Sequence, residues 1–158
     1  RQVMSDCVIP LGADTRGLFA YVPQQNMLLS GTVRENISFF SNDVTDEALW
    51  MAAEIADMAD AIRDMPQGMD TPLGERGAGL SEGQLQRLAI ARAVISGAPI
   101  LMLDEATSAL DEQTEARVLR NLRNLTDRTC LFISHRAAAL EVCDHVVHIE
   151  EDGTFHMD

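Results

Sequence analysis

Short apolar runs alternate along this chain with longer segments whose apolar positions recur every three or four residues. The runs have the length of buried strands, and the three- and four-residue spacing is typical of helices with one buried face. Strands that alternate with helices predict an α/β fold with a mostly parallel sheet. We expect strands at 18–22, 100–103, 129–134 and 146–149, and helices at 32–40, 45–64, 81–96, 111–124 and 137–141.

Local signals mark the ends of several of these elements. Pro23 stops the first strand, and Thr45 and Ser81 stand where helix N-caps are expected. The segment 66–79 holds four glycines and two prolines, so we expect a loop there. A tight turn at 151–153 is expected to start a hairpin near the end of the sequence.

The predicted elements are unevenly distributed. The part between the first and second predicted strands is almost purely helix and loop, which indicates a helical lobe inserted into a sheet-bearing core. We therefore divide the chain into 1–26, a remnant of the core, 27–97, a helical subdomain, and 98–158, the rest of the core. The length of 158 residues suits a single hydrophobic core.

Composition narrows the possible partners. A formal charge of −13 disfavours nucleic acid or an anionic membrane surface, because both require basic patches. All 12 positive residues are arginines, and there is no lysine. No apolar run reaches the roughly 18 residues of a membrane span, and no signal peptide is visible. The sequence starts and ends abruptly, so we expect it to be part of a larger protein.

The three cysteines, Cys7, Cys130 and Cys143, have no spacing typical of metal ligands. They suit a reducing cytosolic setting, and we expect Cys130, within an apolar run, to pack as a small hydrophobe. Trp50 falls off the apolar stripe of its predicted helix. It marks either a partner surface or the edge of the core.

Two adjacent carboxylates, Asp104 and Glu105, follow the apolar run at 100–103. In an open α/β sheet, ligands bind at the carboxyl ends of the strands. Asp104 is expected to hold Mg²⁺ through water, and Glu105 to polarise an attacking water as general base. The alternative is that one carboxylate simply caps a following helix.

A polar segment opens the helix predicted at 81–96. Free backbone N–H groups and the helix dipole make such a place an anion site. Ser81 adds a hydroxyl, and Gly83 allows the backbone to come close to a phosphate. An ordinary capped helix is the alternative.

His135 follows a predicted strand, where a neutral imidazole could bond a transferring phosphate and orient water. A purely structural histidine is the alternative. Gln24 stands at the end of another strand, where its amide oxygen could reach a metal or water, although a glutamine after proline also suits a plain loop. The spacing of His145, His148 and His156 indicates structural or exposed residues.

The order of these motifs resembles the nucleotide-binding domain of ATP-binding cassette (ABC) transporters, of the exporter type, from about residue 19 to residue 153. The stretches 29–37 and 74–77 resemble exporter segments. The matching motifs are YVPQ at 21–24 for the Q-loop, LSEGQ at 80–84 for the signature, ILMLD at 100–104 for Walker B with Glu105 as catalytic glutamate, SALD at 108–111 for the D-loop, and His135 as switch histidine.

The resemblance implies a P-loop NTPase (RecA-like) core with an inserted helical subdomain, ATP and Mg²⁺ as ligands, and a location on the cytoplasmic face of a membrane. It implies a head-to-tail dimer with a second nucleotide-binding domain, coupled to transmembrane domains. From the charge of −13 we expect no nucleic-acid partner. It assigns catalysis to Glu105 and His135, the metal to Asp104 and Gln24, and nucleotide contacts to Gln24, Ser81, Gly83, Gln84 and Asp111.

The sequence departs from the family pattern in two places. Glu82 stands where the signature usually has glycine. Without lysine, the phosphate-cradling loop G-x-x-x-x-G-K-[ST] is absent from these 158 residues, so the amino-terminal strands and the Walker A loop are expected to be missing. We expect this chain alone to bind ATP weakly, to hydrolyse it negligibly and to have an exposed sheet edge.

Two alternative functions share parts of this pattern. A chromosome-maintenance ATPase of the SMC type has the same signature, Walker B and D-loop, but predicts a coiled coil and a basic DNA surface. Residues 43–64 instead hold seven acids and one arginine, and the stretch 32–37 favours the exporter. A degenerate domain kept as a structural partner is the second alternative, against which Glu105 and His135 argue.

Overall fold

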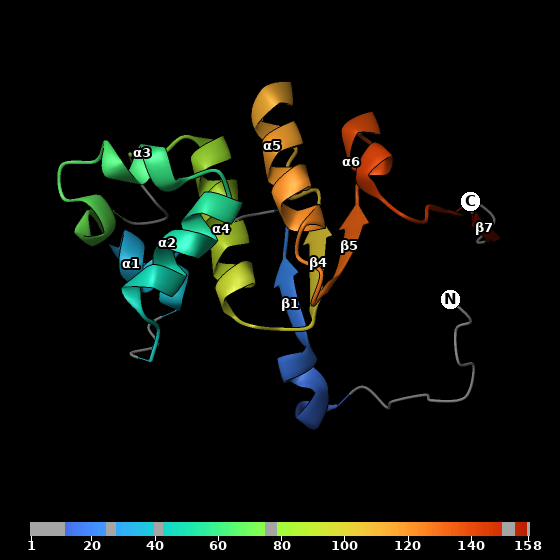
Figure 1. Cartoon of the computed structure of the whole chain (residues 1–158), viewed down its shortest axis with the longest axis horizontal. Coiled ribbons are helices and arrows are strands. Elements are labelled where there is room, and N and C mark those ends of the chain that lie inside the picture. Colours follow the sequence, from blue (N-terminus) through green and yellow to red (C-terminus); the bar gives the residue numbers. More distant parts are fainter. Residues whose placement is uncertain (1–11, 25–27, 40–42, 75–78, 150–153, 158) are drawn as a thin grey trace.

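A three-stranded parallel sheet forms the centre of the computed structural model, which describes residues 12–24, 28–39, 43–74, 79–149 and 154–157. Its strands are β1 (Phe19–Val22), β4 (Ile100–Asp104) and β5 (Thr129–Ile133), in the order β1-β4-β5 (Figure 1). Both strand pairs are parallel, which confirms the predicted sheet type. The carboxyl ends of the three strands therefore meet at one edge of the sheet.

Helices flank this sheet unequally. α1 (Val33–Ser38), α2 (Asp46–Ile55) and α3 (Ala59–Arg63) lie together, and α4 (Glu82–Ile95) stands between them and the strands (Figure 1). α5 (Glu112–Arg123) lies along the sheet and packs against α6 (Ala137–Val142). α1 and α2 pack against α4, which in turn packs against β1, so α4 links these helices to the sheet.

The N-caps explain where the longer helices begin. The side chains of Thr45, Ser81 and Asp111 each accept hydrogen bonds from backbone N–H groups in the first turns of α2, α4 and α5. Such caps satisfy donors that the helix itself leaves unpaired. The predicted starts at 45, 81 and 111 are therefore confirmed to within one residue.

The two faces of the sheet differ in exposure. Alternate side chains of the strands, such as those of Leu101 and Leu103, are buried in the core. The intervening side chains include Tyr21, Leu131 and Ile133, which are about half exposed, at 55%, 49% and 50%. Because successive side chains of a strand point to opposite faces, helices cover one face and leave much of the other to solvent.

The single helix predicted at 45–64 is wrong. α2 ends at Ile55, and the chain passes through Asp57, whose φ of 55° lies in the left-handed region, before α3 begins. Met58 N–H donates to the carbonyl of Ala53 at 2.8 Å, and Asp57 N–H donates to Glu54 at 3.0 Å, which is the pattern of a Schellman helix end. Apolar periodicity continues across this break, so the pattern alone does not reveal it.

Several small elements were not predicted. Two 3₁₀ helices cover Ala13–Leu18 and Gly68–Asp70. β2 (Gly31–Thr32) pairs antiparallel with β3 (Pro72–Leu73), so part of the predicted loop at 66–79 is ordered structure.

The C-terminal hairpin is confirmed. β6 (Val147–Ile149) pairs antiparallel with β7 (Phe155–Met157). The predicted turn at 151–153 lies outside the described residues, as does most of the segment 74–77.

One continuous hydrophobic core includes buried residues of the helices and of the sheet. Trp50 is partly buried and packs against this core, with the Arg63 guanidinium 5.0 Å from its ring centroid, so the core-edge interpretation holds. Cys130 packs against the same core, as predicted.

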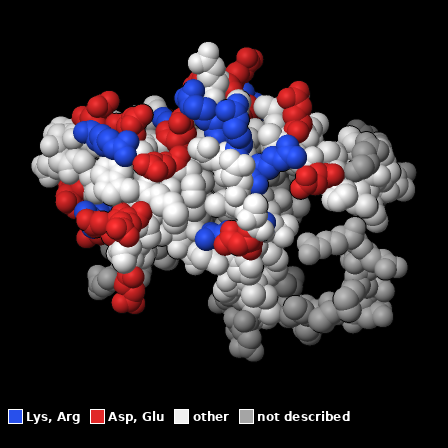
Figure 2. All heavy atoms as spheres, viewed as in Figure 1, with Lys and Arg blue, Asp and Glu red and all other residues white. Residues whose placement is uncertain are grey.

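Acidic side chains outnumber arginines over the first helices, where residues 43–64 hold seven acids and one arginine, and several arginines gather over α5. Figure 2 shows acidic side chains over the helices on the left of the view, and arginines over α5, which holds Arg117, Arg120 and Arg123. Among the described residues, no helix has both the length and the apolar character needed to cross a membrane.

Candidate functional site

The carboxylate of Asp104 lies at the carboxyl edge of the sheet, at the end of β4. Its Oδ2 accepts a hydrogen bond of 2.8 Å from the hydroxyl of Tyr21, which comes from the neighbouring strand β1. This hydrogen bond to a carboxylate raises the pKa of Tyr21. Nothing in the sequence pattern distinguishes Tyr21 from an ordinary strand residue.

Glu105 and His135 meet beside Asp104. Nδ1 of His135 lies 2.8 Å from Oε1 of Glu105. Glu105 has a φ of 50°, and its N–H donates to the carbonyl of Ile133 at 2.9 Å, which holds it against the end of β5. The Glu105 side chain is 17% exposed and that of His135 is 85% exposed. The sequence predicted both residues for the same site, and the structure brings them into contact.

A buried ion pair fixes the residue next to His135. Arg136 Nη2 lies 3.0 Å from Oε2 of Glu115, which is 1% exposed. The hydroxyl of Thr107 donates to the other Glu115 oxygen at 2.7 Å, and Arg136 Nη1 donates to the carbonyls of Thr107 and Leu110 at 2.9 and 3.1 Å. These bonds tie the segment after β5 to the loop after Glu105.

Sequence analysis missed this ion pair, although one signal was available. Glu115 precedes Val118 and Leu119 by three and four positions, so it falls on the buried face of α5. A carboxylate at such a position requires a partner, because an unpaired buried charge is costly.

Reciprocal hydrogen bonds join Ser81 and Gln84 at the start of α4, where the sequence predicted an anion site. Ser81 Oγ accepts from the N–H of Gln84 at 3.2 Å, and Gln84 Oε1 accepts from the N–H of Ser81 at 2.9 Å. This is a capping box. The capping box uses the side-chain oxygens of Ser81 and Gln84 as acceptors. The Ser81 hydroxyl proton and the Gln84 amide protons take no part in it. Glu82 is exposed in the first turn of α4.

Gly83 has a structural role that the sequence did not indicate. A Cβ at this position would lie 3.1 Å from the carbonyl oxygen of Ala109 and 3.2 Å from Cδ2 of Leu110. Both distances are shorter than ordinary van der Waals contact, so glycine at this position lets α4 approach the loop before α5. The expected approach of a phosphate to the Gly83 backbone stays a prediction.

Gln86 joins the two halves of the site and was also missed. It lies in α4 and is 1% exposed. Its Nε2 donates to Ser108 Oγ at 3.0 Å, and its Oε1 accepts from the N–H of Ala109 at 3.0 Å. A buried amide with these bonds fixes the start of α4 relative to the loop that follows Glu105.

Asp111 begins α5 as its N-cap. Its Oδ1 accepts from the N–H groups of Thr114 and Gln113 at 3.0 and 3.1 Å. The hydrogen bonds to Thr114 are the main cause that lowers the pKa of Asp111.

Gln24 is exposed two residues after Val22, which pairs with Leu103, so it lies at the same edge of the sheet as Asp104.

The donor set fits a magnesium ion shared with a nucleotide. Within the described ranges, no group of three or more His, Cys, Asp or Glu residues is placed to hold a metal by itself. Mg²⁺ bound to nucleotides, however, needs only one or two carboxylates, because phosphates and waters complete its shell. Asp104 at a strand end supplies one such carboxylate, with Gln24 at the same edge.

Comparisons with known proteins agree with this geometry. The model of the ABC transporter family matches residues 10–108. An uncharacterised ABC transporter ATP-binding protein of Bacillus subtilis is 44% identical over 139 residues, which are 87% of this chain and 24% of that protein. A provisionally named multidrug export ATP-binding/permease protein of Staphylococcus aureus is 45% identical over 150 residues, 91% of this chain and 26% of that protein.

A solved structure agrees as well. A bacterial Atm1-family ABC exporter with ATP bound has a TM-score of 0.78 and 39% sequence identity, over 84% of this chain and 24% of that one. This chain spans about a quarter of the length of these relatives. The predicted P-loop NTPase fold and the predicted family are confirmed. The chain therefore belongs to the ABC transporter family, as part of a nucleotide-binding domain of the exporter type.

Proposed function

We propose that this chain is the part of an ABC exporter that hydrolyses ATP and couples hydrolysis to transport across a membrane. The observation that carries the proposal is the 2.8 Å contact between Glu105 and His135 at the carboxyl edge of the sheet, directly after Asp104. A carboxylate base held by an imidazole at this edge suits the activation of water for attack on a phosphate.

Glu105 acts as the general base in this proposal. When Glu105 is ionised, the N–H at Nδ1 of His135 donates a hydrogen bond to Oε1. Nε2 of His135 is then left to accept a hydrogen bond from the attacking water. A protonated His135 would instead donate from Nε2 to a phosphate oxygen. In either form the pair orients the water and the transferred phosphate relative to each other.

The metal site consists of Asp104 and Gln24. Bound Mg²⁺ would neutralise charge on the triphosphate and make the terminal phosphate easier to attack. The hydrogen bond from Tyr21 holds the Asp104 carboxylate in one orientation. Gln24, at the same edge, is suited to sense the metal or the water through its amide oxygen.

The start of α4 and Asp111 are proposed to act on the nucleotide of a second domain. The Ser81 hydroxyl, the Gln84 amide and the backbone at Gly83 present donors at the positive end of a helix dipole, which favours a terminal phosphate. Asp111, on the adjacent loop, would communicate across the interface. A head-to-tail dimer of two such domains brings each α4 to the other domain's ATP.

The main phosphate-binding loop of the proposed site must come from residues outside this sequence. No lysine occurs in the 158 residues, so the lysine-bearing phosphate loop is not among them. The purified chain alone is therefore expected to bind ATP weakly and to hydrolyse it negligibly. In the complete protein we assign 27–97 to a helical subdomain and 1–26 and 98–158 to the core.

Transmembrane domains are the proposed mechanical partners, with this chain at the cytoplasmic face of the membrane. The named relatives, one an export ATP-binding/permease protein and one an exporter structure, support this partnership. They do not favour the SMC-type alternative. The net charge of −13 also disfavours the SMC-type alternative, because DNA binding requires a basic surface.

Substitution of His135 tests the proposal in a complete transporter that contains this sequence. His135→Ala is expected to reduce ATP turnover by roughly 100-fold or more, since it removes the group that orients the base and the water. The 85% exposure of the His135 side chain predicts little change in stability. His145→Ala, at an exposed histidine away from Glu105, is the control. Equal turnover in both variants would refute the proposed site.

A further inference from the structure

Asp57 adopts a backbone conformation that favours glycine. Its φ of 55° is left-handed, and it occupies the position after α2 where glycine or asparagine usually ends a helix. A side chain at this position is strained relative to glycine. The aspartate at this position therefore suggests that its carboxylate has a role of its own.

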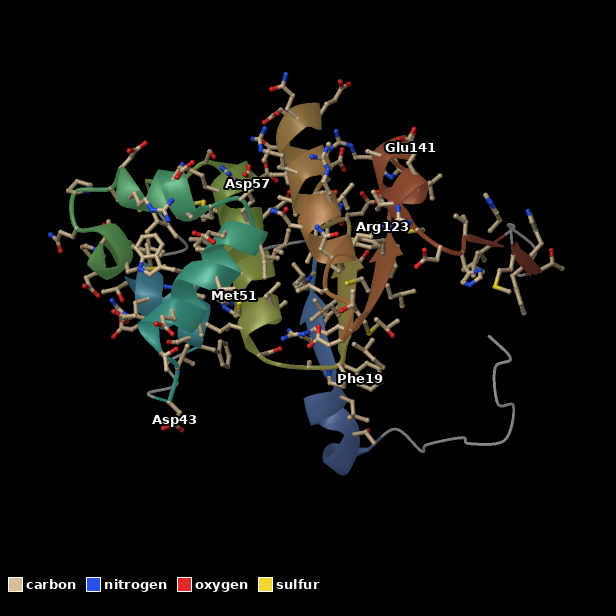
Figure 3. The ribbon with its side chains drawn as sticks, in the orientation of Figure 1. Phe19, Asp43, Met51, Asp57, Arg123 and Glu141 are labelled. Carbon is tan, nitrogen blue, oxygen red and sulfur yellow. The ribbon has the colours of Figure 1, made fainter. Side chains whose placement is uncertain are left out.

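The carboxylate contacts arginines from two other helices. Arg117 of α5 donates from Nε to Oδ1 and Oδ2, both at 3.1 Å, and from Nη2 to Oδ2 at 3.0 Å. Arg87 of α4 lies 3.6 Å from Oδ2 and also donates to the backbone carbonyl of Asp57. Figure 3 shows Asp57 at the junction of the first helices with the rest of the molecule.

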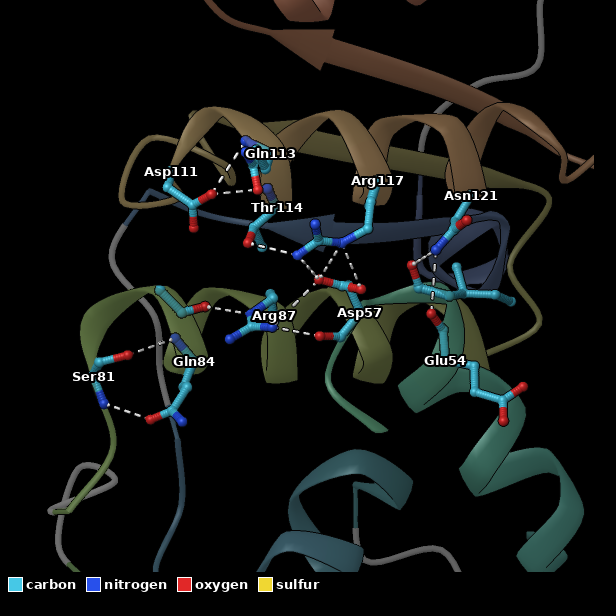
Figure 4. Close-up of polar contacts among 12 residues, drawn as sticks. Glu54, Asp57, Ser81, Gln84, Arg87, Asp111, Gln113, Thr114, Arg117 and Asn121 are labelled. Carbon is cyan, nitrogen blue, oxygen red and sulfur yellow. Dashed lines mark hydrogen bonds and ion pairs between the residues drawn. The ribbon is translucent and has the colours of Figure 1, made fainter. Parts of the chain in front are cut away.

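The same two arginines reach the ends of α4 and α5 that the proposed function uses. Arg87 Nε donates to the carbonyl of Gly83 at 3.3 Å. Arg117 Nη2 donates to Thr114 Oγ1 at 3.0 Å, and the N–H of Thr114 donates to Asp111. Figure 4 shows these contacts as one chain of polar groups that runs from the start of α4, through Asp57, to the start of α5.

We propose that Asp57 is a positioning residue that locks α4 and α5 in one relative arrangement. It thereby presents Gly83 and Asp111 together to the nucleotide of the second domain. This inference rests on the proposed function, in which both helix ends act across a dimer interface. Asp57 is not one of the residues assigned to the nucleotide or to catalysis, so its effect is transmitted through Arg87 and Arg117.

Charge is essential to this arrangement. The side chain of Arg87 is only 16% exposed, and burial lowers its pKa. Two guanidinium groups that face one carboxylate repel each other once that carboxylate is removed. Without Asp57, α4 and α5 lose the charge that holds Arg87 and Arg117 at one point, although the Gln86 contacts remain.

Asp57→Gly provides a discriminating variant, because it removes the carboxylate and also relieves the left-handed strain. If the role of Asp57 is purely structural, loss of the carboxylate and relief of the backbone strain have opposite effects on stability. The net change in stability and in kcat should then be small. The positioning role predicts that kcat for ATP in the complete transporter falls, while the KM for ATP changes less than about twofold. Mutations in a network that links two sites change the coupling between those sites by roughly 2- to 30-fold, so we expect the fall in kcat to lie in this range. The thermal midpoint is expected to stay within a few degrees of wild type.

Two further variants complete the test. Asp57→Asn keeps a residue that tolerates the left-handed conformation and removes only the charge, so we expect kcat to fall about as far as in Asp57→Gly. Asp60→Asn is the control, since Asp60 is 96% exposed and pairs with Arg63 rather than with Arg87 or Arg117. The double variant Arg117→Gln/Asp57→Gly should have a kcat no lower than that of the more impaired single variant, because both substitutions act on the same network.

The outcomes separate this inference from the proposed function. If the wild-type transporter does not hydrolyse ATP, the proposed function fails. If wild type is active and Asp57→Gly matches Asp60→Asn in kcat, the positioning role is refuted while the function stands. A fall in kcat accompanied by a matching fall in thermal midpoint would also refute it, because that result indicates a structural role alone.

Discussion

The hydroxyl of Tyr21 donates a 2.8 Å hydrogen bond to Oδ2 of Asp104 across two neighbouring parallel strands. The partner of the phenol is the same carboxylate that the proposed mechanism assigns to Mg²⁺. An aromatic strand residue that is 55% exposed thus orients a group of the candidate site.

Titration of Tyr21 provides the first test of this contact. The hydrogen bond to Asp104 raises the pKa of Tyr21 above its ordinary 10.0, since a phenolate would lose that bond and face a negative carboxylate. The stabilisation is therefore present below pH 10 and is lost as the pH rises through the raised value. Tyr21 is the only tyrosine in the sequence, so tyrosinate absorbance reports it directly.

Asp104→Asn is the matched variant for this titration. It keeps the hydrogen-bond acceptor and removes the charge, so the midpoint should move back towards 10.0. A wild-type midpoint at or below 10.0 in the folded protein would show that the contact does not form in solution.

Substitution of Gly83 separates packing from phosphate contact. In Gly83→Ala, the new methyl would lie 3.1 Å from the Ala109 carbonyl, so either α4 or the loop must move. Overpacking of this kind typically costs about 1–3 kcal/mol, to be measured by denaturant unfolding without nucleotide. Gly17→Ala, where a Cβ meets nothing within 4 Å, is the control. Equal stability of both variants would contradict the close approach.

The buried pair of Arg136 and Glu115 is expected to dominate the stability of the site. Arg136→Met leaves Glu115, at 1% exposure, without its cation, and breaking such a pair costs about 3–5 kcal/mol. Adding Glu115→Gln should restore part of the loss, because the buried charge is then gone.

An exposed pair gives the comparison for this experiment. Arg123→Met breaks the 3.6 Å pair with Asp144, whose side chains are 55% and 82% exposed. Exposed pairs are worth roughly 0–1 kcal/mol, so this variant should be close to wild type in unfolding free energy. A similar loss in Arg136→Met and Arg123→Met would show that the buried pair has no special role.

Local patterns were sufficient to predict the main elements of this chain and to propose its candidate site residues. Apolar runs gave β1, β4 and β5, and cap residues such as Ser81 gave the helix starts, because both signals depend on neighbours in the sequence. Glu105 and His135 were each proposed for phosphate chemistry because each follows a predicted strand, and the family resemblance assigned both to catalysis.

Contacts between distant segments could not be predicted in the same way. The Asp57 carboxylate meets Arg117, 60 positions later, and the need for glycine at Gly83 depends on the loop at Ala109. The roles of Gln86 and Arg136 likewise depend on how helices and loops meet in three dimensions. Periodicity reports which face of an element is buried, not which residue it faces.

The most direct test of the central claim is ATP turnover by Glu105→Gln in a complete transporter that contains this sequence. Glutamine keeps the size of Glu105 but cannot take a proton from water, so turnover should fall by roughly 100-fold or more while ATP binding is retained. Glu141→Gln, at an exposed position on α6, serves as control and should match wild type. Unchanged turnover in Glu105→Gln would contradict the account and favour a domain kept only as a structural partner.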